Sequence, residues 1–162
     1  KGIPFARNLA IENSNGEYIA FCDSDDYWLP EKINTQIQYF KEHPDCEIVF
    51  TKYENFFERK ELKICKKAVL EKELEKADKK YLPSALIKKS IFKLYGNFDE
   101  KFQTGEDTEF IYRISENGTN VSHFVDTIFY IRRLHGNNIT LIKNTKYSNY
   151  IMNLLRKRIL NK

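Results

Sequence analysis

Residues 16–30 read GEYIAFCDSDDYWLP, an apolar run that ends in a cluster of acidic side chains. Residues 18–22 have the length and the aromatic and aliphatic character of a buried strand, and Asp23, Asp25 and Asp26 follow directly. In open α/β sheets, ligands bind beyond the carboxyl ends of the strands. Three close carboxylates repel one another unless a cation or hydrogen bonds compensate them. The stretch therefore favours a strand followed by a divalent-metal site that grips a phosphate.

Other interpretations of the acidic cluster can be tested by spacing. Asp and Ser are ordinary turn and N-cap residues, and Pro30 could occupy the first position of a helix, so a simple turn stays open. An EF-hand calcium loop that starts at Asp23 needs Gly and Glu where Trp28 and Asn34 stand, which excludes it. An aspartyl phosphotransferase motif would place a small β-branched residue at Tyr27, which makes that reading weak.

Three neighbouring segments together resemble the central signature of family 2 glycosyltransferases. The family pattern joins a Gly-x-x-x-Ala-Arg-Asn helix start, a strand that ends in a DxD-type metal motif, and a following helix opened by proline. Residues 2–8, 16–26 and 30–32 match these parts in order and at similar spacing, which is more specific than DxD alone. The match resumes at residues 105–107 (Gly-Glu-Asp) and at His135.

The resemblance implies a GT-A-like α/β fold, which is a Rossmann-like mixed sheet flanked by helices. We expect residues 1–144 to form part of a GT-A domain and residues 145–162 to form an amphipathic basic helix at the C-terminus. The chain opens directly on the Ala-Arg-Asn element. Members of the family normally carry a βαβα segment before it, which holds much of the nucleotide. The chain is therefore expected to lack the N-terminal nucleotide-binding strands.

The resemblance also implies roles for individual residues. A divalent cation, Mn²⁺ or Mg²⁺, would be held by Asp25 first, then by Asp23 and Asp26, with His135 as a further ligand, and would stabilise the departing diphosphate. The sites predicted to contact the donor or its cofactor are Arg7, Asn8, Asp23 and Asp25. The predicted catalytic residues are Asp107, as the base that deprotonates the acceptor in an inverting single displacement, and its neighbour Glu106.

Each of these residues also has a purely structural interpretation. Residues 104–107 (Thr-Gly-Glu-Asp) fit a capping box, in which Asp107 only satisfies a backbone N–H. Arg7 could form a salt bridge on a helix surface, and His135 could be an ordinary loop residue. Trp28 could stack on a sugar ring or simply pack at the end of the strand.

Composition narrows the class of protein. At 162 residues with 41% hydrophobic residues, the chain has the size of one domain with a real core. A net charge of +4 without a compact basic stripe argues against nucleic acid as a partner. Three cysteines without a CxxC pair argue against disulfides or structural zinc and favour the reducing cytoplasm. Cys22 is expected to pack inside its strand.

Periodicity predicts the other elements. We expect helices at residues 4–13, with Phe5 and Leu9 on the inner side, at 30–43 and at 106–116. Strands are expected at 46–57 and 121–134, the latter broken near Asp126, and a strand followed by a turn of helix at 81–91. Residues 57–80 are highly charged and are expected to form a solvated excursion.

The sequence thus favours a metal-dependent inverting glycosyltransferase that moves a sugar from a nucleotide-diphosphate sugar to a carbohydrate or lipid-linked acceptor, in surface polysaccharide or glycolipid synthesis. The basic segment 145–162 could rest on the inner face of the membrane or pack on the domain through its apolar face. The main alternative is a catalytically silent remnant or a module that binds sugars or a partner. A nucleotidyltransferase is less favoured because no Gly-rich phosphate loop lies near the start.

Overall fold

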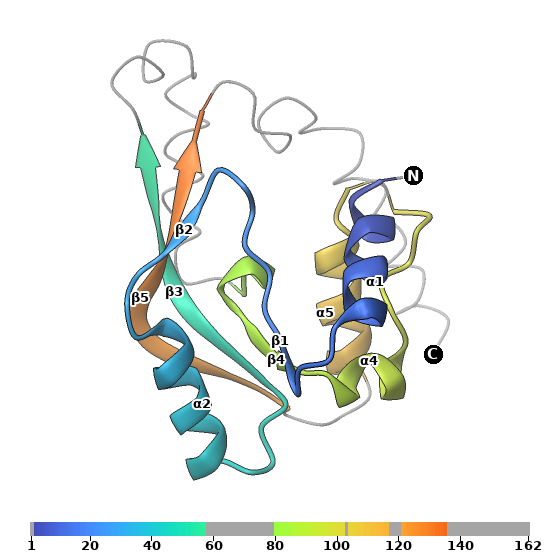
Figure 1. Ribbon diagram of the computed structural model, residues 1–162, viewed down its shortest axis with the longest axis horizontal. Helices are drawn as coiled ribbons and strands as arrows, with labels where there is room; N and C mark the ends of the chain where they lie inside the picture. Colours follow the sequence, from blue (N-terminus) through green and yellow to red (C-terminus); the bar gives the residue numbers. More distant parts are fainter. Residues whose placement is uncertain (1, 58–79, 103, 117–120, 136–162) are drawn as a thin grey trace.

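The computed structural model describes residues 2–57, 80–102, 104–116 and 121–135, and within them the chain builds a five-stranded mixed sheet (Figure 1). The strands are β1 (Tyr18–Ile19), β2 (Tyr27–Trp28), β3 (Ile48–Phe57), β4 (Leu86–Lys88) and β5 (Ser122–Leu134). Their order across the sheet is β1-β4-β3-β5-β2. The long strands β3 and β5 are parallel, and every other pair is antiparallel. The predicted α/β class with a mixed sheet is confirmed.

Helices cover both faces of this sheet. In Figure 1, α1 (Ile3–Asn13), α4 (Ser90–Tyr95) and α5 (Glu106–Glu116) lie together on one side, and α2 (Lys32–Glu42) lies on the other. A short 3₁₀ helix, η1 (Leu82–Ser84), leads into β4. The predicted helix at 106–116 is confirmed at both ends, and the helix predicted at 4–13 begins one residue earlier.

Alternation along β3 divides the apolar residues between two cores, because successive strand side chains point to opposite faces. Ile48 and Phe50 belong to the core under the three-helix side, whereas Val49 belongs to the core under α2. The first core also contains Ile11, Ile19, Leu82, Ala85, Ile87, Ile91, Phe92, Phe98, Phe110 and Ile114. The second contains Phe40, Cys46 and Leu86.

The strand predicted at 18–22 is shorter than expected. β1 ends at Ile19, and the chain then leaves the sheet and re-enters it at Tyr27 as β2, on the opposite edge. Residues 20–26 must therefore pass across the sheet, and they cannot pair within it. Cys22 consequently lies exposed in this connection, and the prediction that it packs inside a strand is wrong.

Two helix details also differ from expectation. α2 begins at Lys32 and is not opened by Pro30, because Glu31 has a left-handed backbone with φ of 67°. On α1, Leu9 is 50% exposed, whereas Asn8 is turned inward and only 7% exposed. An amide at position 8 fits the interior because it finds backbone partners there, as described below.

β5 is one strand with an irregular stretch, which accounts for the predicted break near Asp126. Val125 pairs with Thr51, but the next partner of β3 is Ile128, so Asp126 and Thr127 have no counterpart. The carboxylate of Asp126 pairs with Lys52 at this point. The charged segment 58–79, the predicted helix at 145–162 and Cys65 lie outside the described residues. Among the described helices, none has the length and apolar character needed to cross a bilayer.

Lys32, the first residue of α2, is buried with only 2% of its surface exposed. Its ammonium donates to Gln36 Oε1 at 2.9 Å and lies 4.7 Å from the centre of the Trp28 ring. Burial lowers the pKa of Lys32 from 10.5 to about 8, because the low-dielectric interior disfavours the charged form. The folded state therefore binds this proton more weakly than the unfolded chain does.

This shift predicts a pH-dependent stability difference between the wild type and Lys32→Met. Between pH 8 and 10.5 the unfolded chain keeps the proton that the folded protein has lost, so the wild type gains stability relative to the variant as pH rises. The gain expected from pH 7 to pH 10 is up to about 3 kcal/mol. Urea unfolding of both proteins at several pH values measures it. If the difference in unfolding free energy between the two proteins did not change with pH, the lowered pKa of Lys32 would be contradicted.

Candidate active site

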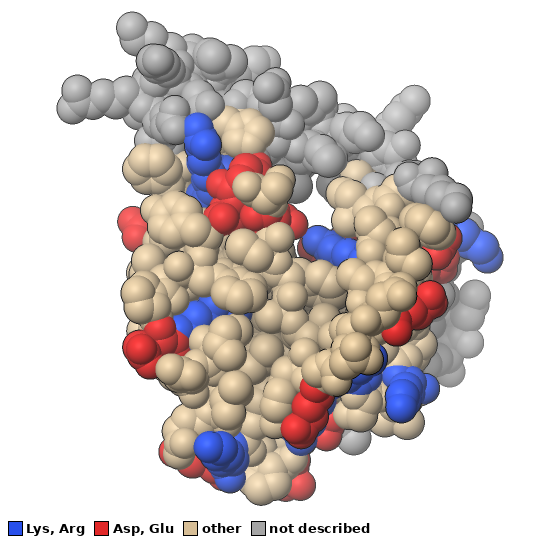
Figure 2. Space-filling model, viewed as in Figure 1, with Lys and Arg blue, Asp and Glu red and all other residues tan. Residues whose placement is uncertain are grey.

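A single cavity of about 600 Å³ gathers nearly all of the residues that the sequence singles out. Figure 2 shows the molecule hollowed between acidic atoms on one side and basic atoms on the other. The walls come from α1, the acidic loop at residues 23–26, the segment around η1, the start of α5 and the end of β5. The lining residues are Ile3, Arg7, Asp23, Ser24, Asp25, Asp26, Tyr81, Pro83, Thr104, Gly105, Glu106, Asp107, Arg132 and His135.

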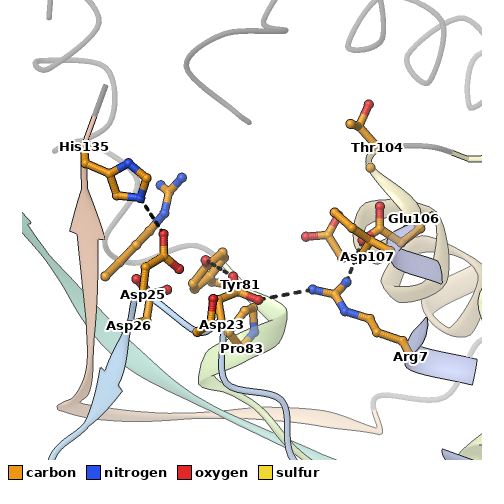
Figure 3. A pocket seen from close by; sticks show the side chains of 14 residues that line it. Arg7, Asp23, Asp25, Asp26, Tyr81, Pro83, Thr104, Glu106, Asp107 and His135 are labelled. Carbon is orange, nitrogen blue, oxygen red and sulfur yellow. Dashed lines mark hydrogen bonds and ion pairs between the residues drawn. The ribbon is translucent and has the colours of Figure 1, made fainter. Parts of the chain in front are cut away.

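Asp25 and His135 meet at the sheet side of the cavity (Figure 3). Asp25 lies in the turn that the acidic loop makes, in which the Asp26 N–H donates to the Asp23 carbonyl at 3.1 Å. His135 follows the last residue of β5, and its Nε2 lies 2.7 Å from Asp25 Oδ2. The fold thus brings together two predicted ligands that are 110 residues apart in the sequence.

Both oxygens of the Asp26 carboxylate accept hydrogen bonds from β5. The Tyr130 hydroxyl donates to its Oδ2 at 2.6 Å, and the backbone N–H of Arg133 donates to its Oδ1 at 2.8 Å. Burial raises the pKa of Asp26, and these two hydrogen bonds oppose that shift. Both carboxylate oxygens therefore anchor the acidic loop to β5. This arrangement speaks against the prediction that Asp26 is a metal ligand.

Arg7 connects α1 with the other two acidic groups of the cavity. Its Nη1 donates to Glu106 Oε1 at 2.6 Å, and its Nη2 lies 3.8 Å from Asp23 Oδ1 (Figure 3). The side chain of Arg7 is 13% exposed and that of Glu106 is 5% exposed, so this is a buried ion pair and not the surface salt bridge considered above. The guanidinium also lies near the rings of Phe21 and Phe98, 5.4 and 5.6 Å from their centres.

Glu106 is held by this pair and is not directed freely at a ligand. Burial, and secondly the neighbouring Asp107, raise the pKa of Glu106, whereas Arg7 lowers it. Its contact with Arg7 joins the first turn of α5 to α1. Glu106 therefore has the environment of a residue that positions its neighbours.

The capping-box interpretation of Asp107 is wrong. A capping box needs the Thr104 hydroxyl to accept a backbone N–H and the Asp107 carboxylate to reach back to Thr104. Asp107 Oδ1 instead accepts the N–H of Thr108 at 2.7 Å. The buried Oγ1 of Thr104 has no hydrogen-bond partner among the described residues. Asp107 remains partly exposed at the α5 wall of the cavity, across from Asp25 and His135 (Figure 3).

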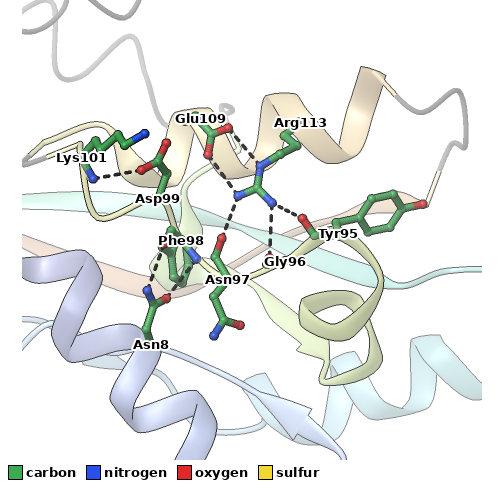
Figure 4. Close-up of polar contacts among 9 residues, drawn as sticks. All are labelled: Asn8, Tyr95, Gly96, Asn97, Phe98, Asp99, Lys101, Glu109 and Arg113. Carbon is green, nitrogen blue, oxygen red and sulfur yellow. Dashed lines mark hydrogen bonds and ion pairs between the residues drawn. The ribbon is translucent and has the colours of Figure 1, made fainter.

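Asn8 does not line the cavity and supports the loop that precedes α5 (Figure 4). Its amide nitrogen donates to the carbonyl of Phe98 at 2.9 Å, and its Oδ1 accepts the Phe98 N–H at 3.0 Å. A third contact runs from the amide nitrogen to Glu100 Oε1 at 3.2 Å. The predicted donor-binding role of Asn8 therefore has no support in the geometry, because its polar atoms are already occupied.

Contacts from α5 hold the same loop, at residues 95–98, from a second side. Arg113 donates to the carbonyls of Tyr95, Gly96 and Asn97, and Glu109 fixes its guanidinium through both carboxylate oxygens, at 3.0 and 3.1 Å (Figure 4). Glu109 is 2% exposed. Because α1 and α5 both grip residues 95–98, the loop that leads to Glu106 and Asp107 is fixed from two sides.

Asp25 and His135 fit a cation that would be bound jointly by the protein and by the phosphates of a ligand. Within the described ranges, no three Asp, Glu, His or Cys side chains are placed to bind one ion together. Asp25 and His135 still offer an oxygen and a nitrogen side by side. Mg²⁺ is usually bound by one or two carboxylates together with substrate phosphates, so a two-residue donor set suits it.

The structure adds lining residues that carry no motif, notably Tyr81, Pro83 and Arg132. Tyr81 lies at the border of the charged segment and nothing in its local sequence marks it. Arg132 could have been noticed only from its place three residues before His135. Trp28, considered above as a sugar contact, is absent from the cavity lining and packs over Lys32 instead.

Comparison with known proteins places this geometry in context. A family model described as glycosyltransferase like family 2 matches residues 2–157. The chain is 44% identical over 64 residues to the Escherichia coli UDP-Glc:alpha-D-GlcNAc-diphosphoundecaprenol beta-1,3-glucosyltransferase WfaP, covering 40% of this chain and 24% of WfaP. It is 42% identical over 52 residues to the putative teichuronic acid biosynthesis glycosyltransferase TuaG of Bacillus subtilis, covering 32% of this chain and 20% of TuaG.

A solved structure shows the same fold. The crystal structure of Staphylococcus aureus TarS 1–349 in complex with UDP-GlcNAc matches with a TM-score of 0.63 at 16% identity, covering 90% of this chain and 42% of that one. This likeness confirms the predicted GT-A-like α/β fold. The chain spans less than half the length of each of these proteins.

The placement of Asn8 predicts a structural phenotype. Asn8→Ala removes both partners of the buried Phe98 backbone groups, so we expect a loss of about 3 kcal/mol in unfolding free energy. Leu9→Ala, on the exposed side of the same helix, should change it by less than about 0.5 kcal/mol. Urea unfolding measures both. Intact stability together with lost nucleotide binding in Asn8→Ala would instead restore the donor-contact role.

Proposed function

The chain belongs to glycosyltransferase family 2, and from this we propose that it transfers a sugar from a nucleotide-diphosphate sugar to a carbohydrate or lipid-linked acceptor. One observation carries the proposal: a single cavity has the Asp25–His135 pair on one wall and Asp107 on the opposite wall. Its volume of about 600 Å³ lies in the range of small-molecule sites. The two walls match the two needs of sugar transfer, which are a stabilised leaving group and a base.

The donor is expected to lie against the acidic loop. The name of WfaP contains UDP-Glc, and TarS has been crystallised with UDP and UDP-GlcNAc, which supports a nucleotide-sugar donor. Arg7 and Arg132 both line the cavity and contribute positive charge, Arg7 from α1 and Arg132 from β5. A divalent cation held by Asp25 and His135 would stabilise the departing diphosphate as a Lewis acid.

Asp107 is the proposed base. In the proposed reaction its carboxylate takes the proton of the acceptor hydroxyl while that oxygen bonds to the anomeric carbon and the bond from this carbon to the diphosphate breaks. A single displacement of this kind inverts the anomeric centre. Asp107 can serve because it is partly exposed to the cavity, and because Glu106, fixed by Arg7, holds the first turn of α5 in place.

The wider role follows from the relatives. The names of WfaP and TuaG include alpha-D-GlcNAc-diphosphoundecaprenol and teichuronic acid biosynthesis, which supports a role in surface polysaccharide or glycolipid synthesis. We place the reaction in the cytoplasm. Peripheral contact of residues 145–162 with the inner face of the membrane is part of the proposal and would bring a lipid-linked acceptor close.

Replacing Asp25 should weaken metal-linked nucleotide binding. For Asp25→Ala we expect at least about a tenfold loss in affinity for UDP in the presence of Mn²⁺, which corresponds to about 1.4 kcal/mol. Isothermal titration of the purified chain, with and without Mn²⁺, measures it. Asp126→Ala, the same change on an exposed part of β5, is the control and should bind like the wild type. No metal-linked heat in the wild type would favour the silent remnant.

Replacing Asp107 should separate chemistry from binding. Asp107→Asn keeps the shape of the side chain but removes its basicity, so sugar transfer should fall about 10²- to 10⁴-fold while UDP affinity changes less than about twofold. Product formation from a nucleotide sugar measures the rate, and Asp126→Asn serves as the control. Turnover at the wild-type rate in Asp107→Asn would exclude it as the base.

A further inference from the structure

Tyr81 stands in the sheet-side wall of the cavity, immediately before η1, and has no part in the mechanism described so far. Its hydroxyl donates to Asp23 Oδ2 at 3.3 Å. This contact joins two residues that are 58 positions apart. It links the segment that precedes β4 to the acidic loop.

The ring of Tyr81 is fixed on several sides. It packs against Tyr53 and Tyr130, with ring centroids 4.8 and 5.5 Å apart, and the guanidinium of Arg132 lies 5.4 Å from its centre. Burial raises the pKa of Tyr81 above its ordinary value of 10, so the hydroxyl keeps its proton near neutral pH and acts as a donor. A rigid ring with a protonated hydroxyl suits the role of an anchor.

Asp23 depends on such an anchor. Its side chain is 43% exposed, and a side chain this accessible samples several rotamers unless specific contacts select one. Tyr81 contacts Oδ2 and Arg7 approaches Oδ1, so the carboxylate is held from two directions. The backbone of Asp23 in turn accepts the N–H of Asp26, which closes the turn that carries Asp25.

We propose that Tyr81 is a positioning residue, which acts through Asp23 to hold the acidic-loop turn so that Asp25 faces the cavity. A row of contacts, Tyr81 to Asp23 to Arg7 to Glu106, then crosses the cavity from the sheet to α5. Asp23 serves chiefly as the link in this row. The effect on catalysis rests on the proposed function, whereas the effect on the loop does not.

A double-mutant cycle tests this role directly. Tyr81→Phe keeps the ring and its packing and removes only the hydroxyl, and Asp23→Ala removes the acceptor. Hydrogen exchange of the backbone amides at residues 22–27 should become about three- to tenfold faster in Tyr81→Phe and in Asp23→Ala. The double variant should exchange no faster than Asp23→Ala, because the two changes remove one interaction. kcat/KM for the donor should follow the same non-additive pattern.

Tyr39→Phe is the matched control. It also removes one tyrosine hydroxyl, which contacts His123 Nδ1 at 3.1 Å away from the cavity, and it should leave exchange at residues 22–27 unchanged. Unchanged exchange in Tyr81→Phe, or an equal further increase in the Asp23→Ala background, would overturn the proposal. If Tyr81→Phe does not fold, unchanged exchange in Asp23→Ala alone would overturn it. A wild type without transferase activity would refute the proposed function, and the exchange cycle would still decide the role of Tyr81.

Discussion

The buried ion pair between Arg7 and Glu106 is the contact on which the shape of the cavity depends. Removing two charges from water is costly, and the pair is favourable only when its geometry is good and other groups satisfy the remaining donors. The geometry is good here, with an N–O distance of 2.6 Å, and the guanidinium also lies near the Asp23 carboxylate and the rings of Phe21 and Phe98. Loss of either partner would leave an uncompensated buried charge. The pair therefore holds α1 against α5 and keeps the first turn of α5, with Asp107, facing the acidic loop.

The sheet topology explains why the remaining groups converge. β1 and β2 lie on opposite edges, so the acidic connection between them must pass over the sheet, where it meets the end of β5. There the three aspartates take different surroundings. Asp26 is bonded to β5, Asp23 lies between Tyr81 and Arg7, and Asp25 meets His135. Three similar side chains within four positions thus differ in their contacts because each faces a different part of the fold.

Sequence patterns succeeded where the controlling interactions are local. The helix at 106–116 was predicted to the residue, since its apolar period lies within the element itself. They could not anticipate contacts with distant partners. The amide of Asn8 is bonded to Phe98, 90 positions away, and nothing in the local sequence marks this contact. Residues 18–22 look like a full strand, but β1 is cut short because its chain must reach the other edge of the sheet.

The order and spacing of residues 2–8, 16–26 and 105–107 were enough to identify the family and the fold, because those motifs are short, contiguous and tied to local backbone shape. Which acid would serve as a base or metal ligand, and which would only position its neighbours, could not be predicted from the sequence in the same way. The contacts that decide it join residues 58, 99 and 110 positions apart. Such contacts exist only after the strands have been ordered in the sheet, and no periodicity along the chain encodes the direction in which a carboxylate will then point.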